Sequence, residues 1–454
     1  MRAVFALLVL AGSLVLALPA AAQDPPAAPP GAPSPVLPAE HPLRPQAPPR
    51  PDRSHGEELL GFVGAVLRGP FELLGKGVLM GAQRLESQCG SFSAGLSARS
   101  SQACAPKHYQ LTFGSIGTRS GMWGLGLGAH NELINPRGLK FGATAKATYR
   151  LYQRYEAYAG WNDPDTLPAF RITGFYDLDT MDEFWGLGPD ASEHHRSDFA
   201  WETYGARAVA SLPERTGVWG TLQLGYEKSF VFGGRQHEHI DTVDRFPGTQ
   251  VPRQEFLVPG ATVVLDWRDA PGHPTRGVLL QASAERYQSL NDLDLNWLTY
   301  GGHGQVHFPL GSEWHILSAK VEAQRSEPDD ESEIPFQYLP RLGGSDHLRG
   351  YNSWRWRDRA AAFGAVEYRY RIWQEQSQNP ETAAVLETAI FLEGGNVGHD
   401  FDDLELGFGD LKTSYGFEIH AFFKDSHVFR MGLGRSEEGL RINFSLDDYW
   451  TALP

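Results

Sequence analysis

The sequence predicts an all-β fold: a transmembrane antiparallel β-barrel of sixteen strands, preceded by a short N-terminal helical segment. Three observations lead to this prediction. From His108 onward, apolar and polar residues alternate with a period of two, which places successive side chains on opposite faces of a strand. Long and short connections also take turns along the chain, as in outer-membrane barrels. Beyond residue 22, no run approaches the ~18 apolar residues that a membrane-spanning helix requires.

Residues 1–22 have the pattern of a secretory signal peptide. Arg2 supplies the positive charge, residues 4–18 form the apolar core, and the alanines at 20–22 resemble a cleavage site. Residues 23–53 are crowded with proline, which cannot donate to a sheet ladder, and they are predicted to form an extended, disordered linker. The chain is therefore expected to be exported.

Residues 54–107 are predicted to form the helical segment. Ser54 and Glu57 have the spacing of a capping box, and apolar residues recur at helical intervals behind them. Cys89 and Cys104, the two cysteines of the chain, lie close together in this segment. We expect them to form one structural disulfide, because the chain is exported and the pair lacks the C-x-x-C spacing of a redox site.

Residues 108–454 are assigned to the barrel. In its clearest segments, polar residues occupy one parity and apolar, often aromatic residues occupy the other. In a membrane barrel the apolar parity faces lipid and the polar parity faces the lumen. The residues expected to face the lumen include Glu367, Arg369, Arg371, Glu387, Glu393, Glu418, His420, Arg441, Asn443 and Ser445.

The connections distinguish a barrel from a soluble β-sandwich, whose strands would alternate as well. When both termini are taken as periplasmic, the outer connections come out long and the periplasmic ones short, which is typical of outer-membrane barrels. An even number of strands lets the sheet close, and lipid cannot satisfy the backbone groups of an open edge. The long connections are 177–198, 232–256, 326–359 and 395–411, and the short ones are 212–217, 310–312 and 424–426.

Charge and motifs exclude several functions. A net charge of −15 argues against a nucleic-acid partner, which would need a basic face. The chain has no H-E-x-x-H, G-x-S-x-G or P-loop motif, so we expect no enzyme activity, no cofactor and no metal site. Histidines at 194–195 and at 237 and 239 fall in predicted outer loops, where solvated side chains are favoured over a metal site.

The stretch from Gly343 to Arg359, GGSDHLRGYNSWRWRDR, combines arginines with two tryptophans. Its composition fits a nucleic-acid patch, a membrane-surface anchor, an internal latch or a solvated surface loop. The acidic net charge removes the first of these. Contact of its cationic and aromatic side chains with lipopolysaccharide stays open, because such side chains favour the membrane interface. The residues concerned are Trp354, Arg355, Trp356 and Arg357.

Several motifs resemble the bacterial surface antigen family, the barrels of outer-membrane assembly factors. They are LGGSDHLRGY, RWRDR and VEYRYRIW, together with FWGLGPDASEHHRSDF, LDWRDAPGHPTRGVLL and FLEGGNVG. The resemblance covers residues 114–446. It implies the outer membrane of a Gram-negative bacterium as the location. It also implies outer-membrane lipids, lipopolysaccharide and a periplasmic or outer-membrane protein as partners.

The resemblance also implies a role for Arg349, Gly350 and Tyr351. In that family the long loop folds back into the barrel, and its R-G-[FY] tip contacts inward-facing acidic residues on the next two strands. Carried over, Arg349 should reach Glu367 and Glu393, and Gly350 should allow the tight turn that presents it. Parity supports this latch independently, since both glutamates are expected to face the lumen. Glu393 stands where the family has aspartate.

The expected function follows from the resemblance. The family's assembly factors carry periplasmic POTRA modules before the barrel, and residues 54–107 leave no room for a complete one. We therefore expect a POTRA-less branch that assists the insertion or translocation of proteins or lipids at the outer membrane. The alternative is a passive channel or structural barrel whose lumen the loop plugs.

Overall fold

The computed structural model describes most of the chain from Tyr109 onward, and all of it belongs to one compact unit. The signal peptide, the linker, the helical segment and the Cys89–Cys104 pair lie outside the described residues. None of the helices in the described part is long and apolar enough to span a membrane. The described residues are 109–115, 123–130, 139–148, 151–161, 169–212, 216–234, 240–249, 252–291, 293–330, 332–374, 384–407, 409–423 and 426–445.

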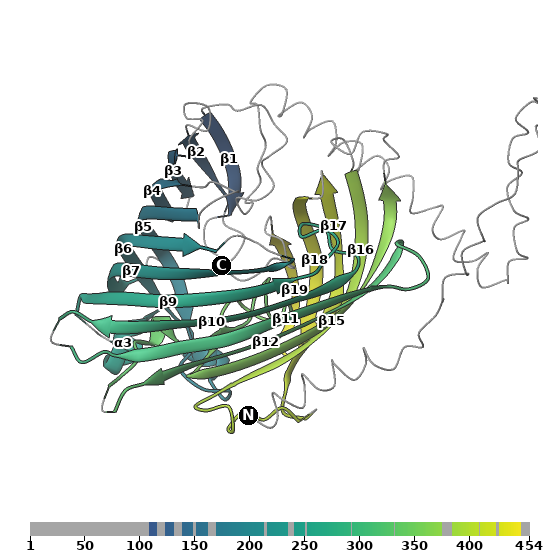
Figure 1. Cartoon of the computed structure of the whole chain (residues 1–454). Coiled ribbons are helices and arrows are strands. Elements are labelled where there is room, and N and C mark those ends of the chain that lie inside the picture. Colours follow the sequence, from purple (N-terminus) through teal and green to yellow (C-terminus); the bar gives the residue numbers. More distant parts are fainter. Residues whose placement is uncertain are drawn as a thin grey trace, which may run out of the picture. The chain divides into compact units, whose positions relative to one another are not determined.

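Nearly all regular structure in the described residues belongs to one antiparallel sheet, which Figure 1 shows as strands lying side by side around a strong curve. The described part of the chain contributes seventeen strands to this sheet, and the predicted sixteen remain when the two-residue β8 (Ile240–Asp241) is set aside. The strands in the first half are β1 (Tyr109–Ser115), β2 (Trp123–His130), β3 (Leu139–Thr148), β4 (Gln153–Trp161), β5 (Ala169–Phe184), β6 (Ser197–Ser211), β7 (Val218–Gly233) and β9 (Gln254–Asp266). Those in the second half are β10 (Gly277–Ser289), β11 (Trp297–Pro309), β12 (His315–Pro328), β15 (Ala360–Gln374), β16 (Ala384–Gly398), β17 (Lys412–Phe423), β18 (Ser426–Ser436) and β19 (Gly439–Ser445).

Each long strand pairs with the next one along the chain, from β1–β2 through to β18–β19. Within the described residues, no ladder joins β1 to β19, so the sheet curves as a barrel but has a seam between its first and last strands. The prediction of a barrel with sixteen long strands is confirmed, whereas the predicted closure is not seen.

The two faces of the sheet have the polarity that the alternation predicted. Val366 is 49% exposed on the outer face of β15, while its neighbour Glu367 is completely buried on the inner face. On β16, Leu392 is 60% exposed and Glu393 is buried. A soluble protein would bury the leucine and expose the glutamate. An apolar outside around a charged inside is the pattern of a barrel surrounded by lipid.

Long connections gather at one end of the strands and short ones at the other, as predicted. The long ones are 185–196, 234–253, 329–359 and 399–411, and the second of these carries β8, α3 (Thr242–Arg245) and η3 (Pro247–Thr249). The prediction that residues 177–198 form one connection was wrong, because β5 extends to Phe184 and β6 begins at Ser197. Polar residues such as Asp177 resemble loop residues in the sequence, but lumen-facing strand positions accommodate them.

Candidate functional site

Residues 329–359, which we call the inserted loop, form a packed structure inside the barrel. They contain η4 (Phe336–Tyr338) and the short hairpin of β13 (Arg341–Leu342) and β14 (Trp356–Arg357). Leu342, Leu348 and Trp356 pack into one apolar cluster with side chains from β15 and β16. This packing contradicts a solvated surface loop.

The hairpin positions the tip of the loop through two glycines with left-handed backbone. Gly343 has a φ of +114° and Gly344 a φ of +100°. A Cβ on Gly343 would lie 2.3 Å from the carbonyl oxygen of Asn352, so only glycine fits there. The chain reverses at this point and carries Arg349 down into the lumen.

Arg349 is completely buried and bonds to carboxylates on three strands. Its Nε donates to Glu393 Oε1 at 2.8 Å, and its backbone N–H donates to Glu393 Oε2 at 2.7 Å. Its Nη1 donates to Glu367 Oε2 at 3.0 Å and to Glu418 Oε2. The structure therefore brings Arg349 together with both predicted partners and with Glu418, which the resemblance did not indicate.

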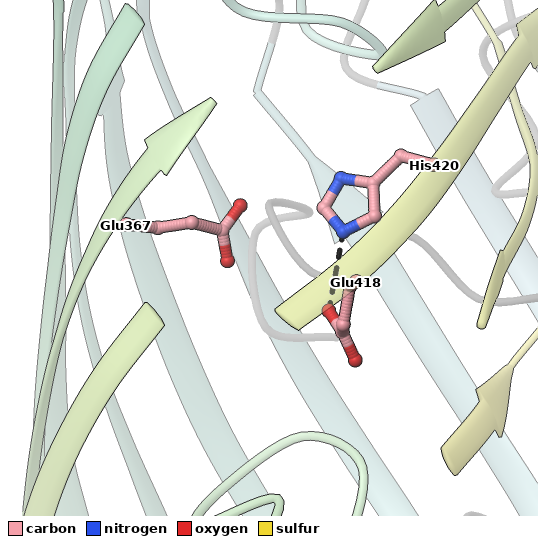
Figure 2. Close-up of side chains that lie close together, drawn as sticks. All are labelled: Glu367, Glu418 and His420. Carbon is pink, nitrogen blue, oxygen red and sulfur yellow. Dashed lines mark hydrogen bonds and ion pairs between the residues drawn. The ribbon is translucent and has the colours of Figure 1, made fainter. Parts of the chain in front are cut away.

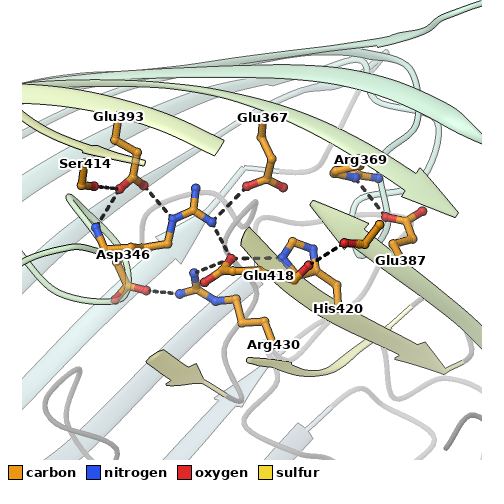
Figure 3. Close-up of polar contacts among 11 residues, drawn as sticks. Asp346, Glu367, Arg369, Glu387, Glu393, Ser414, Glu418, His420 and Arg430 are labelled. Carbon is orange, nitrogen blue, oxygen red and sulfur yellow. Dashed lines mark hydrogen bonds and ion pairs between the residues drawn. The ribbon is translucent and has the colours of Figure 1, made fainter. Parts of the chain in front are cut away.

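Two of the three carboxylates, Glu393 and Glu418, bond to further groups on the barrel wall, as Figure 3 shows. Ser414 donates to Glu393 at 2.6 Å, and His420 Nε2 lies 3.1 Å from Glu418 Oε2. Arg430 on β18 binds Asp346 of the inserted loop at 2.6 Å. Ionised groups this deeply buried are stable only when paired and hydrogen-bonded, which is the arrangement found here.

Backbone contacts extend the attachment of the tip to the last strands. Asn443 on β19 donates to the carbonyl oxygen of Arg349 at 2.7 Å, and Ser436 on β18 donates to that of Gly350 at 2.8 Å. The guanidinium carbon of Arg349 also lies 3.6 Å from the ring centre of Phe391, within cation–π range. The tip thus binds all five strands from β15 to β19.

Gly350 lies in the expected turn, but its role differs from the expected one. The N–H of Tyr351 donates to the carbonyl of Leu348 at 2.9 Å and closes the turn. The left-handed residue is Leu348, with a φ of 58°, and not Gly350. A Cβ on Gly350 would lie 2.8 Å from the backbone carbonyl of Arg435, so glycine is needed for close approach to β18.

The neighbouring arginines and tryptophans also face inward. Arg355 donates to Glu438 at 2.7 Å and to the carbonyl of Ala191 at 2.7 Å, so it joins the β18–β19 turn to the β5–β6 connection. Tyr351 packs edge-on against the buried Trp356, with ring centres 4.5 Å apart. The sequence left contact of Arg355 and Arg357 with lipopolysaccharide open, and the burial of both side chains argues against it.

Arg341 and Arg357, which face each other across the β13–β14 ladder, have no carboxylate within salt-bridge distance among the described residues. The guanidinium of Arg357 lies 5.4 to 5.8 Å from the ring centres of Phe184, Phe199, Phe336 and Trp354. Burial lowers the pKa of Arg357 to about 9, which leaves it protonated at neutral pH. Aromatic faces take the place of a counter-ion there.

Glu367, Glu418 and His420 come close enough to one another to suggest a metal site, with ligand atoms within 4.8 Å (Figure 2). Arg349 Nη1 bonds both carboxylates, so its guanidinium is the cation that they hold. Glu418 and His420 could have been found from the sequence, because their parity already placed them in the lumen. Asp346 and Arg430 had no such signal.

Comparisons with known proteins identify the fold. A family model described as the Omp85 superfamily domain matches residues 136–434. The crystal structure of BamA from Haemophilus ducreyi lacking POTRA domains 1–3 is similar, with a TM-score of 0.55, 14% identity, and coverage of 75% of this chain and 69% of that one. CdiB from Escherichia coli aligns with a TM-score of 0.49 and 10% identity over 75% of this chain and 63% of its own. No curated protein matches the sequence.

Proposed function

The chain belongs to the Omp85 superfamily, and from that premise we propose that it assists the insertion or translocation of proteins or lipids at the outer membrane. The motifs quoted above predicted this relationship, and the matched residues cover most of the barrel. The proposed mechanism involves no covalent chemistry. Its partners would be the lipids and lipopolysaccharide of the outer membrane and a protein that delivers clients.

The seam between β1 and β19 is the observation that carries the proposal. Each of these strands has a sheet neighbour on one side only within the described ladders. Unpaired backbone groups at a sheet edge are a template for another strand, and in lipid they are costly to leave unpaired. A client strand could pair there by edge addition and enter the membrane beside the barrel.

The latch has a defined part in this proposal. Arg349 ties the inserted loop to Glu367, Glu393 and Glu418, and the same tip bonds to β18 and β19 beside the seam. We infer that the latch holds the last strands in place while the seam exchanges partners. Loss of the latch would then impair activity through the position of β19.

The test is a reconstituted insertion assay. The intact chain is placed in liposomes, and a urea-unfolded, eight-stranded outer-membrane barrel is added as client. The proposal predicts faster client folding than in empty liposomes, and slower folding with an Arg349→Ala variant than with the natural chain. Equal client folding with and without the protein would refute it. A large, steady conductance in planar bilayers without any client would favour the alternative, a passive channel.

A further inference from the structure

The β9–β10 connection, residues 267–276, differs from the described short turns at its end of the barrel. It lies at the end with the short turns, which is the periplasmic end in outer-membrane barrels, yet it is longer than the β6–β7, β11–β12 and β17–β18 turns. His273 and Pro274 at its tip are buried, whereas Pro271 and Arg276 are exposed. We call this segment the inner turn.

The tip of the inner turn contacts the part of the lumen wall that β15, β16 and β17 form. His273 Nε2 lies 2.7 Å from Glu387 Oε1 on β16, and Arg369 Nη2 on β15 donates to the carbonyl of Pro274 at 2.8 Å. The His273 ring also lies against Phe422 on β17, with ring centres 4.1 Å apart. Because β11 and β12 separate β10 from β15 in the sheet, the tip must extend over the lumen side of these two strands to make the contacts.

The base of the inner turn is built to hold the tip in that position. The Asp269 carboxylate accepts bonds from the backbone N–H groups of Ala270, Thr275 and Arg276 at 2.9, 2.9 and 3.1 Å. Gly277 has a φ of +114°, and a Cβ there would lie 2.3 Å from the carbonyl oxygen of Trp267. A turn closed this firmly presents His273 without further ordering.

The inner turn and the inserted loop attach to the same wall from opposite ends. On β15, Glu367 binds Arg349 of the loop, and Arg369, two residues further, binds the inner turn. Glu387 pairs with Arg369 at 3.0 Å as well as with His273, so the two attachments share neighbouring side chains. Figure 3 shows the Arg369–Glu387 pair beside Glu367 and Glu418.

We propose that the inner turn is a second plug, which closes the lumen from the periplasmic end while the inserted loop fills it from the outer end. Its closed state is the contact of His273 and Pro274 with Glu387, Phe422 and Arg369. Solutes would cross the lumen only when both plugs are displaced, and a client would be directed to the seam. The inference depends on the barrel alone, so it can fail or hold independently of the insertion activity.

Conductance in planar bilayers measures directly whether the inner turn closes the lumen to ions. Four forms of the full chain are compared: the natural chain, His273→Ala, Arg349→Ala and the double variant. Pro271→Ala is the matched control, since it changes an exposed residue of the same turn. We expect the double variant to conduct several-fold more than Arg349→Ala alone, and the Pro271 control to match the natural chain. A double variant that conducts no more than Arg349→Ala would overturn the proposal.

Limited proteolysis is a second test, and it applies to the natural chain as well as to the variants. The Arg268 side chain is 3% exposed and pairs with Asp266 at 2.8 Å, so trypsin should not cut after it in the natural chain in liposomes or in the Pro271 control. His273→Ala should release the turn and allow cleavage there, as identified by fragment mass. Rapid cleavage after Arg268 in the natural chain would also overturn the proposal.

Discussion

Removal of the Arg349 side chain should release the inserted loop. Arg349→Ala removes the guanidinium that binds the buried Glu367 and Glu393, whereas Glu418 keeps Arg430 at 4.0 Å and His420 at 3.1 Å. Removing one partner of a buried ion pair typically costs about 3–5 kcal/mol. Because two buried carboxylates lose this cation, we expect a loss of about 4 kcal/mol, at or above the middle of that range. At ~1.4 kcal/mol for each factor of ten, the released loop gains roughly a thousandfold in population.

Two measurements compare the variants. The first is the temperature at which the folded band disappears in gels, and the second is the extent of trypsin cleavage inside residues 341–359. Arg359→Ala is the matched control, because Arg359 belongs to the same loop but its side chain makes an exposed contact, with His399 at 3.2 Å. We expect Arg349→Ala to unfold at a lower temperature and to be cleaved in the loop, while the control resists. Arg349→Lys should fall between them, since lysine keeps the charge but lacks the guanidinium fork. If Arg349→Ala were as heat-stable and protease-resistant as the control, Arg349 would not stabilise the inserted loop, and the prediction would be refuted.

Three other predictions concern neighbouring features. Gly350→Ala should destabilise the fold by about 1–3 kcal/mol, because its Cβ would press on β18, whereas Gly409→Ala, with open space around it, should not; unfolding midpoints decide this. In the Arg349→Ala variant, Zn²⁺ should restore heat stability by binding the two carboxylates and the imidazole of Figure 2, and adding His420→Ala should abolish that rescue. For Asp269, burial raises the pKa, but the bonds from Thr275 and the turn N–H groups outweigh it and leave the pKa lowered. Its stabilisation of the inner turn is therefore present above the unfolded pKa of about 3.9 and lost as pH falls through the lower folded value. Hydrogen exchange of residues 270–276, corrected for intrinsic rates and compared with Asp269→Asn, should show this loss only in acid.

Local patterns were sufficient to predict much of this protein. The alternation placed Glu367, Glu393 and Glu418 on the lumen face, and burial confirms each position. The loop motif identified the family, and it named Arg349 as the residue that would reach inward. Local patterns did not predict features that depend on packing. These are the residues at which β5 ends, the role of Gly350, and the inward orientation of Arg355 and Arg357.

The sequence by itself determined the fold class, the face on which each charged side chain lies, and the family, because all three depend on residues close together in the chain. Only the tertiary structure decided which of those charges meet. Arg349 and Glu418 are 69 residues apart, and His273 and Glu387 are 114 apart. Their contact depends on the curvature accumulated over several ladders and on two connections that turn inward. No local pattern encodes that curvature, so neither of these two contacts could be derived from the sequence.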